Sequence, residues 1–223
     1  MTRSNFKGMK NLLWSLMGIW FLGVLVAGHI GVFGSGSPYS MSVPIPLGLG
    51  AVLPIVVFGI WYKASATFRK YVLSFNPVVL TAVQSWRVGG IVFLILLVKG
   101  ILPPSFAYPA GLGDIAIGVT APFVALALSR KKLSSGAFIL WQTAGIADLV
   151  IAVGTGVLSS STQLGILAHG TTTRVMGLLP MSLIPTFAVP FLIILHIICI
   201  AQARQSELAM PKNLSKNLSK NSL

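Results

Sequence analysis

The chain has 223 residues, of which 55% are hydrophobic and 9% are charged, whereas soluble domains carry roughly a quarter charged residues. Sixteen lysines and arginines stand against three acids, which gives a formal net charge of +13. Because long apolar runs dominate the sequence, nucleic-acid binding is excluded as the main explanation of this charge. The single cysteine excludes an internal disulfide framework and a cysteine-based zinc cluster.

Six stretches come close to the roughly 20 mostly apolar residues that a membrane-spanning helix needs. The predicted fold class is therefore an all-α integral membrane protein with six transmembrane helices in one domain, residues 1–203. The predicted spans are about 12–33, 46–62, 77–98, 108–128, 137–158 and 181–202. Residues 204–223, which end in two Asn-Leu-Ser-Lys repeats with nothing to bury, are predicted to be a disordered cytoplasmic tail.

The basic residues predict the orientation, because lysines and arginines that flank spans are retained in the cytoplasm. With the N-terminus inside, Lys99 and Arg174 lie outside, Arg87 lies within the third span, and every other lysine and arginine is cytoplasmic. Both termini are therefore predicted to be cytoplasmic. The expected location is the inner membrane of the cell, with anionic lipid attracting the basic face.

Two segments interrupt the helical pattern. The loop 159–177 contains an apolar stretch, 164–168, which is either a short re-entrant or interfacial helix or part of a solvated loop with a hydrophobic contact. Pro180, Pro185 and Pro190 recur at intervals of five, and each removes a backbone donor. The last span is therefore predicted to be bent or broken.

Charges inside the spans are the most informative feature of the sequence. Each charge near a bilayer centre costs roughly 2.5 to 3.5 kcal/mol, so it should face protein or water and have a partner. At about 1.5 Å per residue, Arg87 and Asp148 both lie roughly 15 to 17 Å from the inner ends of their spans. Asp114 is expected some 6 or 7 Å nearer the outside, within reach of a long side chain. The sequence predicts an Arg87–Asp148–Asp114 cluster.

Small and polar residues share helix faces with these charges, since positions three and four apart lie on one side. Small residues let helix backbones approach closely in lipid, so spans three, four and five are predicted to meet at these faces. The candidate residues of a transport or ion pathway are Arg87, Asp114, Asp148, Gln84, Gln142 and Thr155.

Two ten-residue segments, 110–119 and 144–153, are identical at half of their positions and each contains one of the aspartates. The offset of 34 residues is one helix, so the two copies would cross the membrane in opposite directions, as inverted repeats of transporters do. The alternative is chance, because small apolar residues are common in membrane spans.

The histidines are weak metal-site candidates. His29 is predicted near the outer side of the membrane and His196 near the inner side, so the two cannot share one metal or haem. His196 and Cys199 lie one turn apart, but two ligands without a third or fourth do not make a zinc site. A packing role is the favoured interpretation, and neither a metal site nor a cofactor is expected.

The sequence Gly111-Leu112-Gly113-Asp114 resembles the GxGD motif of intramembrane aspartyl proteases of the presenilin and prepilin-peptidase type. That resemblance implies two aspartates that activate a water. The partner aspartate precedes the motif in those families, whereas Asp148 follows it here. The presenilin tyrosine and a Pro-Ala-Leu motif are also absent. A GxGD-like protease is kept as the enzymatic alternative.

A second pattern, from Arg87 through 103–114 and then Leu183-Ile184-Pro185-Thr186-Phe187, resembles uncharacterised small polytopic membrane proteins of bacteria. This resemblance covers spans three to six and implies a fold type without an activity. The chain has no P-loop, zincin or nucleotide-binding motif and no setting for a serine or cysteine nucleophile. No catalytic residue is therefore assigned.

Two functional hypotheses from different classes remain. The first is a small permease or proton-coupled transporter, in which Arg87 holds Asp148 ionised and Asp114 is the protonatable or cation-binding acid. The second is a structural or accessory membrane subunit, in which the same cluster only locks helices together. The expected partners are the lipid bilayer, protons or a small solute, and a second copy or another membrane protein, with no nucleic acid.

Overall fold

A computed structural model describes residues 3–34 and 45–209, and these ranges are helical with no strand. The elements are α1 (Arg3–His29), α2 (Ile45–Ala64), α3 (Ala66–Val72), α4 (Pro77–Val83), the 3₁₀-helix η1 (Gln84–Gly90), α5 (Ile91–Val98), α6 (Pro104–Ser129), α7 (Ser135–Leu158), the 3₁₀-helix η2 (Thr173–Gly177), the π-helix η3 (Ile184–Ala188) and α8 (Val189–Ala209). Within the described ranges, six helical segments are long and apolar enough to cross a membrane. The predicted all-α class and its six long helices are confirmed.

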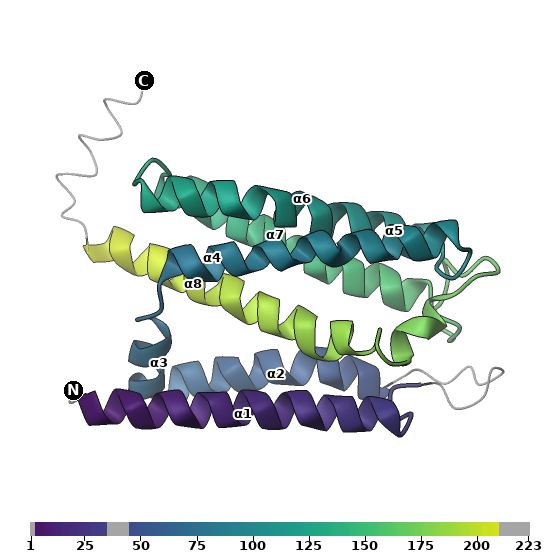
Figure 1. Cartoon of the computed structure of the whole chain (residues 1–223), viewed down its shortest axis with the longest axis horizontal. Coiled ribbons are helices and arrows are strands. Elements are labelled where there is room, and N and C mark those ends of the chain that lie inside the picture. The colour runs from purple at the N-terminus through teal and green to yellow at the C-terminus, as the bar shows by residue number, and fades with distance from the viewer. Residues whose placement is uncertain (1–2, 35–44, 210–223) are drawn as a thin grey trace.

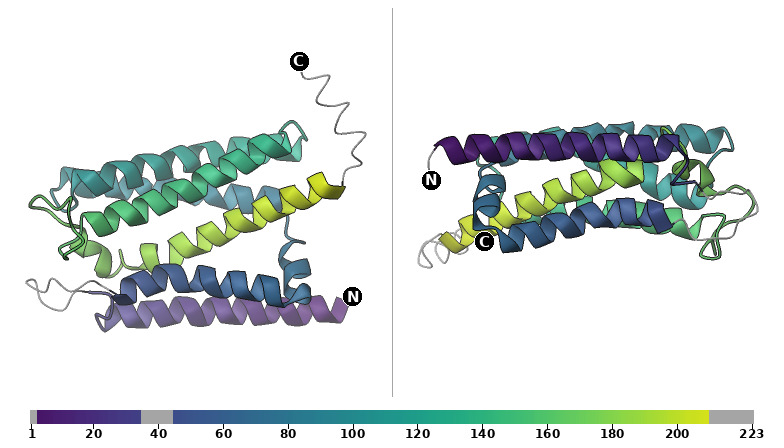
Figure 2. Two further views of the ribbon diagram at one scale, coloured as in Figure 1. Left: turned by 180° about the vertical axis from the view of Figure 1, so that it is seen from behind. Right: turned by 90° about the horizontal axis from the view of Figure 1, so that it is seen from below.

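The long helices run roughly parallel, and α8 crosses diagonally between two groups (Figure 1). The pair α1 and α2 forms one edge, and α4–η1–α5, α6 and α7 form the other (Figure 2). We call the end with the N-terminus, α3 and the C-terminal end of α8 the terminal end. The opposite end, with the connections 99–103 and 159–183, is the loop end.

The last candidate span is irregular at its start, where its prolines predict a bend or a break. A turn and the π-helix η3 precede α8. In a regular α-helix the carbonyl of Thr186 would accept from the backbone N–H of residue 190, but Pro190 has none. The indole Nε1 of Trp20 donates to this carbonyl at 3.2 Å, and Phe187 packs on the Trp20 ring at 4.6 Å. This irregular start therefore provides a docking point for α1.

The third span differs from the continuous α-helix that the sequence predicts. It is α-helical in α4 and α5 but winds as a 3₁₀-helix through η1. Because a 3₁₀-helix has three residues per turn, side chains three apart stand directly above one another. Gln84, Arg87 and Gly90 form such a line, and all three are buried. The local winding therefore aligns one polar stripe toward the interior.

Several boundaries differ from the expected ones. Helix α6 begins at Pro104 instead of about residue 108, with proline at its first position, where a missing N–H costs nothing. Asp114 is consequently ten residues from that end and lies deeper than predicted. Helix α8 continues to Ala209, into the segment expected to be disordered, while the Asn-Leu-Ser-Lys repeats lie outside the described residues.

The loop 159–177 is largely irregular, and its one helical piece is η2 rather than a helix at 164–168. The side chains of Leu164 and Ile166 are exposed. Of the two interpretations, the structure supports a loop with limited hydrophobic contact. This loop covers part of the loop end of the bundle.

The terminal end is densely packed. The ring of Trp61 stacks on that of Phe68 with centroids 3.9 Å apart, and Phe58 lies edge-on to Phe68. The buried residues of this cluster are Phe58, Phe68, Val72, Leu80, Phe138, Leu195, Ile198, Cys199 and Ala203. The short helix α3 therefore closes one end of the bundle with aromatic side chains.

Candidate functional site

Arg87 is the centre of a polar cluster between η1, α6, α7 and α8. Its side chain is 1% exposed. Its Nε donates to Asp114 Oδ1 at 2.7 Å, and its Nη2 donates to Asp148 Oδ2. The side chain of each aspartate is 14% exposed. The structure thus brings together the three charges that the sequence predicted to meet.

The remaining donors of Arg87 point toward α7 and α8. Its Nη1 donates to the carbonyl oxygen of Gly145 at 3.1 Å and lies 3.4 Å from His196 Nε2. Four contacts therefore hold the guanidinium in one orientation. Because a buried arginine without partners would cost several kcal/mol, this set of acceptors explains how the charge is tolerated.

Glycines make room for the cluster. A side-chain carbon at Gly90 would overlap Asp114, and one at Gly113 would overlap Asp148. A side-chain carbon at Gly145 would overlap the imidazole ring of His196. The approach of the charged groups to one another thus depends on missing Cβ atoms on η1, α6 and α7.

His196 begins a hydrogen-bonded chain that runs away from the charges. Arginine N–H groups only donate, so His196 Nε2 accepts and its proton is on Nδ1. His196 Nδ1 then donates to Gln142 Oε1. Gln142 Nε2 donates to Thr81 Oγ1 at 3.2 Å, and Thr81 donates to the carbonyl of Pro77 at 2.8 Å. Each buried polar group in this chain has a partner, and His196 is neutral.

Gln84 is also buried, one turn of η1 before Arg87. Its Nε2 donates to the carbonyl of Leu192 at 3.4 Å. Its Oε1 has no hydrogen-bond partner in the described part of the chain. Gln84 therefore links η1 to α8 without joining the charged contacts directly.

Thr155, the last of the predicted pathway residues, stands apart from the cluster. Its hydroxyl donates to the carbonyls of Ile151 and Ala152 in its own helix, at 2.8 and 3.2 Å. The structure therefore brings five of the six candidates to the α4–η1/α6/α7/α8 contact and leaves Thr155 about two turns away along α7.

Sequence reasoning missed His196 and Thr81. His196 was expected near the end of its span because that span was ended at residue 202, whereas the apolar helix continues to Gln205. Thr81 precedes Gln84 by three residues, as Gln84 precedes Arg87. A search for polar residues at intervals of three could have found Thr81.

The structure also bears on the metal site and the protease that the sequence left as alternatives. Both ring nitrogens of His196 are occupied by Arg87 and Gln142, so this histidine is not free to bind a metal together with Cys199. The aspartates of the GxGD alternative both bind Arg87. A general acid and base pair that shares one water would need carboxyls facing that water, so the geometry gives the protease alternative no support.

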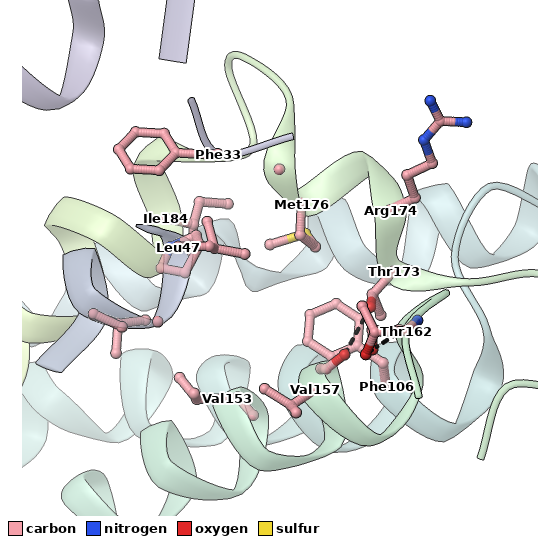
Figure 3. A pocket seen from close by; sticks show the side chains of 18 of the residues that line it. Phe33, Leu47, Phe106, Val153, Val157, Thr162, Thr173, Arg174, Met176 and Ile184 are labelled. Carbon is pink, nitrogen blue, oxygen red and sulfur yellow. Dashed lines mark hydrogen bonds between the residues drawn. The ribbon is translucent and has the colours of Figure 1, made fainter. Parts of the chain in front are cut away.

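A cavity of about 280 Å³ extends from the loop end to Asp114. Its walls are mainly apolar and come from α2, α5, α6, α7, η3, α8 and the loop 159–177, together with Phe33. Figure 3 shows Val153 and Val157 of α7 along one wall, with Thr162, Thr173 and Arg174 grouped at one side. Asp114 and Arg174 are the charged residues of the lining, so the cavity joins the charged cluster to the surface.

The opposite side of the cluster is filled by packed side chains. Between Arg87 and the terminal end lie the chain from His196 to Thr81 and the aromatic cluster around Phe68. Cys199, one turn beyond His196, is 1% exposed. The cluster is therefore approachable from the loop end and closed toward the terminal end.

Residues 44–204 match a family model described as Domain of unknown function (DUF8737). No curated protein and no solved structure matches the chain. The matched region includes α2 to α7, most of α8 and every residue of the polar cluster, in agreement with the resemblance to proteins without an assigned activity. Since the match covers more than half of the sequence, the chain belongs to the DUF8737 family.

Proposed function

We propose that this protein is an integral membrane protein of the inner membrane, with six spans and both termini in the cytoplasm. The six apolar helices support the membrane assignment. Basic residues support the orientation, because the terminal end carries most of them and the loop end carries Lys99 and Arg174. The basic residues of the terminal end are Lys7, Lys10, Lys63, Arg69, Lys70, Arg130, Lys131, Lys132 and Arg204.

Within that membrane, the proposed function is a small permease or proton-coupled transporter in which Asp114 is the accessible acid. One observation carries this proposal: a cavity reaches Asp114 from the loop end, while the terminal end is packed shut. A transporter that exposes its site to one side at a time has this asymmetry. In the proposed orientation the structure corresponds to an outward-open state.

The charge balance supports the same role. Arg87 faces two carboxylates and compensates one of them, and His196 is neutral. Asp114 lines the cavity, whereas Asp148 does not. Asp114 is therefore the acid that can exchange a proton or bind a cation, and Asp148 serves to hold Arg87.

The test is proton flux into liposomes with a trapped pH indicator, driven by an imposed membrane potential. The expected result is flux with the wild type and none with Asp114→Asn, because the exchangeable acid is lost. Thr155→Val, which alters a hydroxyl bonded only within α7, is the matched control and should retain flux. Undiminished flux in a folded Asp114→Asn protein would refute the role of Asp114.

A second candidate, a structural or accessory subunit, is favoured by a different observation. Arg87 finds its partners within the chain, and only 11% of the residues in the most apolar stretches of α1 and α2 are buried, compared with 50% in that of the last candidate span. Those lightly covered apolar helices could contact a partner. In that case the protein would co-purify with another membrane protein, and Asp114→Asn would change stability without changing any flux.

A further inference from the structure

We propose that the cavity binds a monovalent hydrophobic cation, with Asp114 as its counter-charge. This inference rests on the proposed function and adds the chemical class of the substrate. Three independent features of the cavity lead to it: its lining, its aromatic residues and the charge of the cluster at its inner end.

The lining does not suit a small metal ion bound directly by protein oxygens. Apart from Asp114, the oxygen-bearing side chains are Ser160, Ser161, Thr162 and Thr173, and all four belong to the loop segment 159–177. Small metal cations need about six oxygen ligands around one point. The cavity offers instead a long apolar wall and one carboxylate, which suits an occupant with an apolar body.

Aromatic side chains supply the second feature. Phe33, Phe93 and Phe106 line the cavity, and the rings of Phe93 and Phe106 meet edge-on at 5.3 Å. The face of an aromatic ring attracts organic cations, and ring-lined sites recognise quaternary ammonium groups. Phenylalanine rings combined with one carboxylate therefore favour a cation over a neutral or anionic molecule.

The charges that face Asp114 supply the third feature. Arg87 of η1 binds it directly, Asp148 of α7 shares that arginine, and neutral His196 of α8 contacts the arginine from the other side. The cluster therefore carries one uncompensated negative charge when both aspartates are ionised. A bound monovalent cation, or a proton in its absence, balances this charge.

The remaining charged residue of the lining does not oppose this assignment. Arg174 is exposed, and Figure 3 shows its guanidinium directed away from the labelled apolar residues, at the edge of the cavity. A solvent-exposed charge is strongly screened by water and salt. Asp114 therefore determines the electrostatic preference at the inner end.

The experiment measures binding of radiolabelled tetraphenylphosphonium to the purified full-length protein in mild detergent. Tetraphenylborate, an anion of nearly the same size and shape, is the control for apolar partitioning. The expected result is saturable binding of the cation, at least about tenfold weaker in Asp114→Asn, and no saturable binding of the anion in separate samples. Asp114→Glu retains the charge and should retain most of the binding.

Two further variants separate direct contact from general effects. Asp148→Asn also removes the uncompensated charge of the cluster, but it leaves the Asp114 carboxylate in the cavity lining, where it can contact the cation directly. Its loss should therefore be smaller than that of Asp114→Asn. Val153→Phe fills the cavity beside α7 and should weaken binding with both aspartates intact. Thermal unfolding of each variant shows that it is folded, and Val153→Phe tests the site even if Asp114→Asn does not fold.

Several results would overturn the inference. These are no saturable cation binding to the wild type, equal binding of the anion, equal losses in the two aspartate variants, or unchanged binding in Val153→Phe. Cation binding without Asp114-dependent proton flux would instead contradict the proposed function alone. Asp114-dependent flux without cation binding would contradict this inference alone.

Discussion

The two sides of the Arg87 cluster are built differently. Toward the loop end, Asp114 borders a cavity lined by apolar side chains and hydroxyls. Toward the terminal end, His196, Gln142 and Thr81 form a hydrogen-bonded chain inside dense packing. Of the groups that contact Arg87, Asp114 therefore borders the cavity, whereas the others hold the arginine in place. This difference separates the group that could exchange a ligand from the groups that hold the site in shape.

The largest expected loss of stability comes from Arg87→Gln, which removes the contacts on both sides of the cluster at once. Two carboxylates lose their cation, and His196 and the Gly145 carbonyl lose a donor. Removing one partner of a buried ion pair costs about 3–5 kcal/mol, so the variant should unfold at a much lower temperature in detergent. The triple variant with Asp114→Asn and Asp148→Asn should recover much of this stability. A single variant as stable as the wild type would contradict the central role of Arg87.

A smaller effect is expected from Gly145→Ala, which acts on the closed side. The new methyl group would overlap the ring of His196, and overpacking of this kind costs about 1–3 kcal/mol. Thermal unfolding should detect the loss. The matched control is Gly154→Ala in the same helix, where a Cβ meets nothing within 4 Å; it should be as stable as the wild type or slightly more stable. Equal stability of the two variants would show that α7 and α8 do not pack as described.

The smallest effect is expected from Thr81→Val, at the far end of the hydrogen-bonded chain. Gln142 Nε2 would lose its acceptor while shape is preserved, and an unsatisfied buried donor costs about 1–3 kcal/mol, with the lower end expected for this long 3.2 Å contact. Thr155→Val makes the same change at a hydroxyl bonded only within α7 and should cost less than about 0.5 kcal/mol. Chemical unfolding of the two variants side by side measures the difference, and equal values would remove Thr81 from the network.

The similar segments 110–119 and 144–153 supply one aspartate each to Arg87. Their surroundings nevertheless differ, because Gly111 faces Leu94 of α5 whereas Gly145 faces His196 of α8. Asp114 also borders the cavity, and Asp148 does not. Similar sequences thus have different neighbours, which gives the two carboxylates different roles in the proposed function.

Much of the fold could be predicted because its signals are local. Apolar length predicts six helices, and the prolines at 180, 185 and 190 predict the irregular start of the last helical segment. The meeting of Arg87, Asp114 and Asp148 could be predicted because buried charges are too costly to leave unpaired. Each of these inferences needs only the residues themselves and the known spacing of a helix.

The remaining features depend on contacts between distant segments. No local pattern signals the 3₁₀ winding of η1, which aligns Gln84 with Arg87, and the role of His196 depends on the space left by Gly145. The cavity is likewise formed by α2, α6, α7 and a loop that are far apart in the chain. Composition and helix period therefore determined the helices and the pairing of the charges. Only the tertiary packing, which sets the neighbours of each charge, decided that Asp114 borders the cavity and that His196 closes the other side.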